Sequence, residues 1–97
     1  MIIGVAGLGL IGGSLAKAYK EQPGHTVYGY DIDESIQSFA QLSGAIDGVL
    51  DCESAGRCDC LFIAIYPEDA LLYIRKMAPY FNRHGLVIDC CGTKRHI

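Results

Sequence analysis

The chain has 97 residues, of which 51% are hydrophobic and 20% charged, which excludes a disordered or collagen-like segment and fits one small domain. Its 8 basic and 11 acidic residues give a net charge of -3, so it lacks the basic surface that nucleic-acid binding requires. The longest apolar stretches, Met1–Gly13 and Cys60–Tyr66, are too short to span a membrane, and the N-terminus has no features of a secretory signal. We therefore expect a cytoplasmic protein that binds neither nucleic acid nor membrane.

The five cysteines indicate a reducing compartment. A secreted, disulfide-stabilised domain usually has an even number of cysteines. The pairs Cys58–Cys60 and Cys90–Cys91 are spaced more closely than the ligands of structural zinc sites, and they lie inside or beside apolar runs. We expect thiols packed as small hydrophobic side chains and no metal site.

The first quarter of the chain predicts a strand followed by a helix. Ile2–Ala6 is an unbroken apolar run, typical of a strand covered on both faces. Apolar residues then recur every four positions, which predicts an amphipathic helix that ends at Pro23–Gly24. The predicted core residues of this helix are Ile11, Leu15 and Tyr19.

A second strand and helix follow. Thr26–Tyr30 is the next apolar run, and Asp33 is placed to cap the N-terminus of a helix that ends just before Gly44. The apolar residues of this helix are Ile36, Phe39 and Ala40. Ile46–Leu50 has the pattern of a short extra strand.

The second half predicts two further strands with a helix between them. Gly56–Asp59 is interpreted as a loop or short turn, and the apolar runs Cys60–Ile65 and Leu86–Cys90 as buried strands. The intervening helix opens at Glu68 and Asp69 and is closed by Pro79. Its predicted buried face consists of Leu71, Ile74 and Ala78.

This alternation predicts the α/β class with a doubly wound parallel sheet of the Rossmann type, truncated after its fifth strand. Right-handed crossovers between parallel strands lead to the strand order 3-2-1-4-5. We expect residues 1–97 to be a dinucleotide-binding domain at the front of a longer protein, whose substrate and dimerisation domain is absent here. The fifth strand then has an unpaired apolar edge, which favours self-association.

Gly7–Gly12, with the sequence GLGLIG, lies directly between the first predicted strand and helix. In this context the first glycine permits a tight turn, the second lets a pyrophosphate approach the backbone, and the third lets the helix pack close to the sheet. The N–H groups of the first helical turn would then face the phosphates. A glycine-rich turn that binds nothing is the alternative interpretation.

Asp31 follows the second predicted strand, about 20 residues after the third glycine, where a carboxylate binds the adenosine ribose hydroxyls. The alternative is a helix cap, for which Asp33 is better placed. No basic residue occurs in Ile32–Ser38 to neutralise a 2′-phosphate. The sequence therefore predicts NAD and not NADP as the cofactor.

Three segments resemble prephenate and arogenate dehydrogenases. Gly7–Ala16 is similar to the opening of that family, which has Gly-Gly-Ser-Leu after the fingerprint. Asp59–Pro67 resembles its fourth strand, with an Asp, an apolar run and a Pro. Asp89–Lys94 resembles its Asp-Val-Gly-Ser-x-Lys segment after the fifth strand, and the resemblance covers essentially the whole chain.

The resemblance implies oxidative decarboxylation of prephenate to 4-hydroxyphenylpyruvate in tyrosine biosynthesis, by an enzyme that is a homodimer at full length. The family's general base is a His that would lie beyond this chain, so His84 and His96 are interpreted as surface residues. The family's substrate-binding Ser aligns with Gly92, and Thr93 is adjacent. We therefore assign no catalytic residue to this chain. Lys94 is interpreted as positioning the start of the next helix.

The turn, the acidic residue and the two later segments together give the predicted cofactor-binding residues. They are Gly7, Leu8, Gly9, Leu10, Ile11, Gly12, Asp31, Ile65, Tyr66, Pro67 and Gly92. Alternatives to prephenate as substrate are arogenate or the substrate of another β-hydroxyacid-type dehydrogenase. A regulatory dinucleotide-sensing domain is the non-enzymatic alternative, although such a domain would not need Pro67 or the segment Asp89–Lys94.

Overall fold

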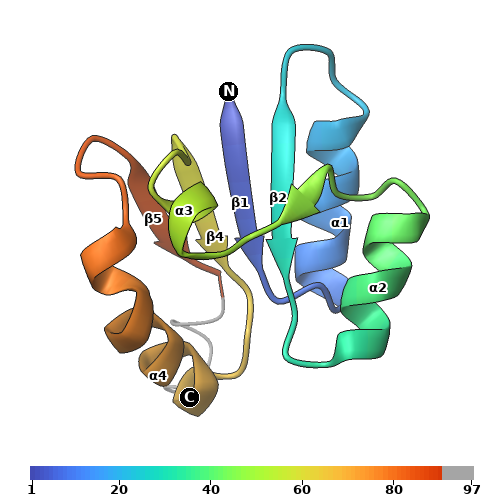
Figure 1. The fold of residues 1–97 in the computed structure, drawn as a ribbon. Helices are drawn as coiled ribbons and strands as arrows, with labels where there is room; N and C mark the ends of the chain where they lie inside the picture. The colour runs from blue at the N-terminus through green and yellow to red at the C-terminus, as the bar shows by residue number, and fades with distance from the viewer. Residues whose placement is uncertain (91–97) are drawn as a thin grey trace.

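The computed structural model describes residues 1–90, which form a five-stranded parallel sheet with helices on both faces (Figure 1). The strand order is β3-β2-β1-β4-β5, as predicted from the sequence. In chain order the elements are β1 (Ile2–Ala6), α1 (Leu10–Lys20), β2 (Thr26–Tyr30), α2 (Glu34–Leu42), β3 (Gly48–Val49), α3 (Cys52–Ala55), β4 (Cys60–Ile63), α4 (Pro67–Met77), a 3-10 turn (Ala78–Tyr80) and β5 (Leu86–Asp89).

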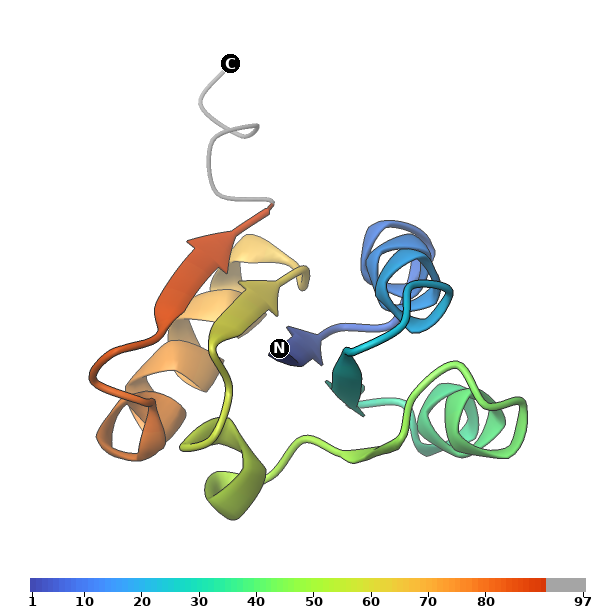
Figure 2. The ribbon, with the colours of Figure 1, turned by 90° about the horizontal axis from the view of Figure 1, so that it is seen from above.

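The helices form two layers around the sheet (Figure 2). Helices α1 and α2 cover one face and α3 and α4 the other, as right-handed crossovers on either side of β1 require. Two hydrophobic clusters fill the spaces between the sheet and these layers. Because all strand pairs are parallel, the carboxyl ends of the strands meet at one edge of the sheet, at the bottom of Figure 1.

Strand β1 explains why the strands appear as unbroken apolar runs in the sequence. Successive side chains of a strand point to opposite faces. Ile3 and Val5 accordingly belong to the cluster under α1 and α2, whereas Ala6 belongs to the cluster under α3 and α4, and all three are fully buried. A strand covered on both faces therefore has no polar positions.

The predicted elements agree closely with the structure at several points. The bounds of β1 and β2 are as predicted, whereas β3, β4 and β5 are shorter than the apolar runs that contain them. Asp33 caps α2, since its carboxylate accepts a hydrogen bond from the Ser35 N–H at 2.9 Å. Gly44, just past the end of that helix, has a φ of +80°.

The prediction of the buried face of α4 is wrong for Leu71 and Ala78, whereas Ile74 packs against the buried cluster as predicted. The helix buries Ala70, Tyr73 and Met77, whereas Leu71 is 52% exposed and Ala78 is exposed. The two sets of positions are offset by one residue, a rotation of roughly 100° about the helix axis. Both sets are apolar, so periodicity alone does not separate them, and the ring of Tyr73 fills the space above the sheet.

Other apolar residues are also less buried than predicted, among them Ile36 on α2, which is 39% exposed. Phe39 on α2 is 72% exposed, and Ala40 is the buried residue of that helix. Ile11 on α1 is 40% exposed because it borders the cleft described below. Leu15 and Tyr19 pack against the buried cluster, as predicted.

Strand β5 forms one edge of the described sheet. Leu86 and Val87 on this strand are exposed, so the predicted apolar edge is present, and self-association through it stays a prediction. None of the helices within residues 1–90 combines the length and hydropathy that crossing a bilayer demands.

Candidate functional site

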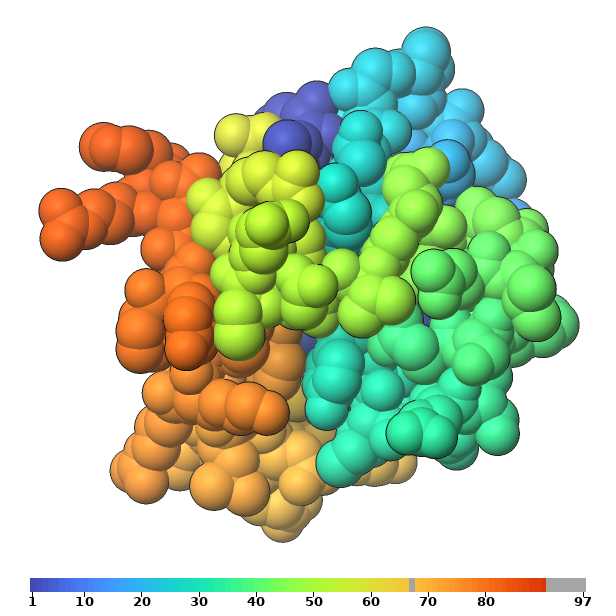
Figure 3. Space-filling model, viewed as in Figure 1, coloured from blue at the N-terminus to red at the C-terminus, as the bar shows by residue number. Residues whose placement is uncertain are grey.

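A cleft of about 760 Å³ lies at the carboxyl ends of β1, β2 and β4. One wall of the cleft is made by the β1–α1 turn and the end of β2, and the other by α3 and α4. Figure 3 shows α3 and α4 at the surface beside the end of β2. Open α/β sheets bind ligands at this position, where the strand order reverses. The predicted cofactor-binding residues that line the cleft are Gly7, Gly9, Leu10, Ile11, Asp31, Ile65 and Tyr66.

Gly7 makes the turn out of β1 with a φ of +96°, which strongly favours glycine. A side chain at this position would overlap the carbonyl oxygen of Ala64 and the side chain of Ile65. The Gly7 N–H donates to the carbonyl oxygen of Tyr30 at 2.6 Å. The turn is therefore held between the ends of β2 and β4.

Gly9 and Gly12 have different functions in the turn. Gly9 is the N-cap of α1, and a Cβ added to it would have no atom within 4 Å, so a ligand has room to reach the backbone. A Cβ on Gly12 would overlap the Gly7 carbonyl oxygen, so this glycine allows helix and turn to be in contact. The first N–H groups of α1 have no partner within the helix, and such N–H groups bind anions.

Leu8 contributes to the site through its backbone. Its side chain is buried in the core, and its N–H donates to Oδ2 of Asp31 at 2.7 Å. The other carboxylate oxygen of Asp31, Oδ1, accepts from the N–H of Asp33 at 2.9 Å. Since Asp33 caps α2, Asp31 does not serve as the helix cap, and its carboxylate lies on the cleft.

The opposite wall consists mainly of apolar side chains. Tyr66 is 77% exposed at the N-cap of α4, and α4 begins at Pro67. Tyr73 stacks on Tyr30, with ring centroids 5.4 Å apart and an interplanar angle of 23°. The Tyr73 hydroxyl is buried and has no hydrogen-bond partner among residues 1–90, and burial raises the pKa of Tyr73 far above its usual range.

Several residues of this wall were not predicted from the sequence, because they come from segments that are far apart in the chain. They are Leu50 and Asp51 from the β3–α3 connection, Cys52 from α3, and Leu72, Tyr73, Lys76 and Met77 from α4. The β3–α3 connection has a detectable signal in Asp51, because Asp is one of the residue types preferred at helix N-caps.

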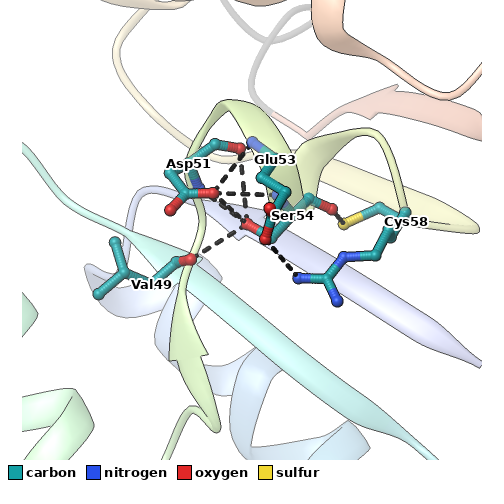
Figure 4. A network of polar contacts seen from close by, with 6 residues as sticks. Val49, Asp51, Glu53, Ser54 and Cys58 are labelled. Carbon is teal, nitrogen blue, oxygen red and sulfur yellow. Dashed lines mark hydrogen bonds and ion pairs between the residues drawn. The ribbon is translucent and has the colours of Figure 1, made fainter.

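Figure 4 shows the polar network at this connection. Asp51 Oδ1 accepts from the N–H groups of Glu53 and Ser54, at 3.1 and 2.9 Å, and the Asp51 N–H donates to Ser54 Oγ at 2.8 Å. Hydrogen bonds from the backbone and side chain of Ser54 lower the pKa of Asp51. The network fixes α3 as part of the cleft wall, although α3 has only four residues.

The cysteines differ in their surroundings. Cys58 is buried, and burial raises the pKa of its thiol to about 11, whereas Cys52 is exposed. Within residues 1–90, no three His, Cys, Asp or Glu side chains lie close enough together to hold a metal ion. Cys91, Gly92, Thr93, Lys94 and His96 lie outside the described residues.

The geometry of the cleft suits a nucleotide with phosphates. The N-terminus of α1 offers N–H groups to an anion, and the first turn of this helix has no acidic residue to compete. Asp31 offers acceptors for a diol. The apolar wall of α4 and the β3–α3 connection offers a surface for a flat base.

Comparison with known proteins gives one family. The model described as "Prephenate dehydrogenase, nucleotide-binding domain" matches residues 15–97. The prephenate dehydrogenase of Bacillus subtilis (strain 168) is 34% identical over 94 residues, covering 94% of this chain and 25% of the relative. That of Lactococcus lactis subsp. cremoris (strain MG1363) is 29% identical over 93 residues, covering 94% and 26%. The chain thus spans about a quarter of the length of these relatives.

Two solved structures share the fold. Synechocystis arogenate dehydrogenase superimposes with a TM-score of 0.81 and 29% identity, covering 92% of this chain and 32% of that chain. The prephenate dehydrogenase of A. aeolicus, solved in complex with hydroxyphenyl propionate and NAD+, superimposes with a TM-score of 0.79, 24% identity and the same coverage. The predicted fold class is therefore confirmed.

Proposed function

This chain belongs to the prephenate dehydrogenase family through its nucleotide-binding domain, and we propose that it binds NAD for the oxidative decarboxylation of prephenate to 4-hydroxyphenylpyruvate. NAD, when bound, accepts a hydride from the substrate. The residues described here bind and orient the cofactor, and the general base and the rest of the substrate site belong to other parts of a longer, homodimeric, cytoplasmic enzyme. Residues 1–97 alone would then bind NAD without turning over prephenate.

The observation that carries the proposal is the convergence of the glycine turn and Asp31 on one cleft. The open space at Gly9 and the N-terminus of α1 fit the pyrophosphate. The Leu8 N–H and the Asp33 N–H occupy one direction of each Asp31 carboxylate oxygen. Each oxygen retains a further lone pair for a ribose hydroxyl.

The same carboxylate selects against NADP. A 2′-phosphate at this position would lie beside the Asp31 charge, with Asp33 and Glu34 close by in the sequence. Repulsion between such charges near a surface amounts to a few kcal/mol, roughly a hundredfold in affinity.

Titration of the protein with NAD and NADP at low salt tests the cofactor. We expect NAD to bind about a hundredfold more tightly. Asp31→Ala should weaken NAD binding roughly 10- to 100-fold, because each charge-assisted hydrogen bond contributes about 1.5–3 kcal/mol. It should strengthen NADP binding by a smaller factor, because the repulsion between the Asp31 charge and the 2′-phosphate is removed while the charges of Asp33 and Glu34 remain. Glu21→Gln, at an exposed position at the C-terminal end of α1 and away from the cleft, is the matched control for an acidic residue off the site. Equal affinities for the two cofactors would contradict the proposal.

Arogenate is the second candidate substrate, favoured by the similarity to Synechocystis arogenate dehydrogenase at a TM-score of 0.81. Steady-state assays of the full-length enzyme with each substrate distinguish the two. Turnover of arogenate but not prephenate would replace the first assignment and leave the cofactor assignment in place.

A further inference from the structure

We propose that Gln37 is a positioning residue that holds Asp31 in place for the adenosine ribose, a role that rests on the proposed function. Gln37 lies on α2, half-buried, and its side-chain amide makes two hydrogen bonds to the end of β2. Its Oε1 accepts from the Asp31 N–H at 2.7 Å, and its Nε2 donates to the Gly29 carbonyl oxygen at 2.9 Å. Because one partner is a donor and the other an acceptor, the two bonds define the orientation of the amide.

The hydrogen bond between the Asp31 N–H and Gln37 Oε1 replaces a missing bond of the sheet. Strand β3 has only two residues, and its ladder with β2 ends where the Leu50 N–H donates to the Gly29 carbonyl oxygen at 2.8 Å. In a parallel ladder every second residue of a strand bonds to the same neighbour, so the Asp31 N–H is the next donor on this edge. The chain has by then turned into α3, and Gln37 supplies the acceptor that the strand does not.

At the opposite end of β3, a side chain also replaces a backbone hydrogen bond of the ladder. There the Val27 N–H donates to Oδ2 of Asp47 at 2.7 Å, so a side chain again extends a ladder that the two-residue strand leaves short. Asp47 is also paired with Lys20 at 2.7 Å. Gln37 differs because the residue that it holds, Asp31, lies on the cleft.

Gln37 therefore secures the backbone of Asp31 on the edge of β2 that faces away from the glycine turn. On the other edge, the Gly7 N–H donates to the Tyr30 carbonyl oxygen, and the Asp31 carboxylate accepts from the Leu8 N–H. With both edges held, the carboxylate keeps its place beside the turn. An amide suits this position, since a carboxylate at residue 37 would lack the donor for Gly29 and would add negative charge beside Asp31.

A double-mutant cycle on NAD binding tests the role. Gln37→Met keeps the length of the side chain and removes both hydrogen bonds. We expect it to weaken NAD binding roughly fivefold, an effect about as large as the loss of one hydrogen bond. It should also lower the preference for NAD over NADP. In the Asp31→Ala background, Gln37→Met should change NAD binding by less than about twofold, because the residue that it positions is gone. Gln41→Met, one turn along α2 at an exposed position, is the matched control and should have no effect.

Gln37→Glu gives an independent reading. It retains the acceptor for the Asp31 N–H, but it lacks the donor for the Gly29 carbonyl oxygen and adds a negative charge beside Asp31. We therefore expect it to weaken NAD binding at least as much as Gln37→Met. Amide hydrogen exchange on the unliganded protein should show lost protection at Asp31 in Gln37→Met and unchanged protection at Gly7.

The outcomes are distinct. An equal loss of NAD affinity in the wild-type and Asp31→Ala backgrounds, or equal loss of protection at Asp31 and Gly7, would mean a general structural effect and would overturn the inference alone. Failure of the wild-type protein to bind NAD would overturn the proposed function and the inference with it.

Discussion

The two walls of the cleft are held by different interactions. On the wall of the β1–α1 turn, backbone groups make the contacts, with the Gly7 N–H on the Tyr30 carbonyl oxygen and the Leu8 N–H on the Asp31 carboxylate. On the wall of α4, side chains make them, and Tyr73 and Met77 belong to a buried apolar cluster. The first wall places polar groups, and the second provides an apolar surface.

This difference predicts different responses to mutation. A wall built from backbone contacts tolerates few added atoms, because closely packed backbone has no room to move. A wall built from side-chain packing is sensitive to removed atoms, because truncation leaves a cavity. The predictions that follow test this difference, with the expected losses of stability taken from the largest to the smallest.

Tyr73→Ala should be the most destabilising of these changes. It removes a buried ring that stacks on Tyr30, and truncation of a large buried aromatic residue lowers the free energy of unfolding by about 3–5 kcal/mol. Tyr66→Ala, a matched change on the exposed side of the same wall, should alter it by less than about 0.5 kcal/mol. Urea denaturation of both variants measures the difference.

Tyr73→Phe separates the contribution of the Tyr73 ring to stability from that of its hydroxyl. The Tyr73 hydroxyl has no hydrogen-bond partner within residues 1–90, so its removal should leave stability unchanged or raise it slightly. A loss as large as that of Tyr73→Ala would show that the hydroxyl, and not the ring, holds this wall.

Gly12→Ala should test the other wall by adding one carbon atom. The new Cβ would overlap the Gly7 carbonyl oxygen, and we expect the free energy of unfolding to fall by about 3 kcal/mol, at the upper end of the usual overpacking range. Gly9→Ala adds the same atom to open space. It should cost less than about 1 kcal/mol of stability, as expected for a change of N-cap residue, and should weaken NAD binding.

Thermal and urea denaturation, combined with NAD titration, separate these two glycine variants. If Gly12→Ala were as stable as the wild type, the close contact between α1 and the turn would not be needed for the fold. If Gly9→Ala bound NAD normally, the pyrophosphate would not approach the backbone there.

Alkaline pH should lower the free energy of unfolding through a buried thiol in the apolar cluster that α4 covers. Cys58 belongs to the same apolar cluster as Tyr73, and burial raises the pKa of its thiol from 9.0 to about 11. The unfolded thiol ionises first, so the stability contributed by this group is present below pH 9 and is lost as the pH rises to about 11. The loss should be on the order of 2 kcal/mol.

Urea denaturation between pH 8 and pH 11 measures the free energy of unfolding as a function of pH. In Cys58→Ala the slope of this dependence should be smaller than in the wild type. Cys52→Ala, which removes an exposed thiol, is the control and should leave the slope unchanged. An unchanged slope in Cys58→Ala would assign the alkaline loss to other groups.

The strands and the glycine turn could be predicted because their signals are local. The bounds of β1 and β2 coincide with unbroken apolar runs, and Gly7–Gly12 has its characteristic spacing between a strand and a helix. Helix α3 could not be predicted from periodicity, since four residues complete barely one turn. The face of α4 could not be predicted because its two candidate apolar faces differ by one position.

The sequence by itself determined the order of the sheet, the sharp turn at Gly7 and the placement of an acidic residue after β2, because each depends on residue types and spacing along one short segment. The tertiary structure alone decided which side of α4 forms the cleft wall and which residues of α3 join it, since these depend on packing between segments far apart in the chain. It also decided the role of Gln37. A glutamine on a helix has no distinctive pattern, and this one contacts Asp31 because β3 ends one ladder bond too early.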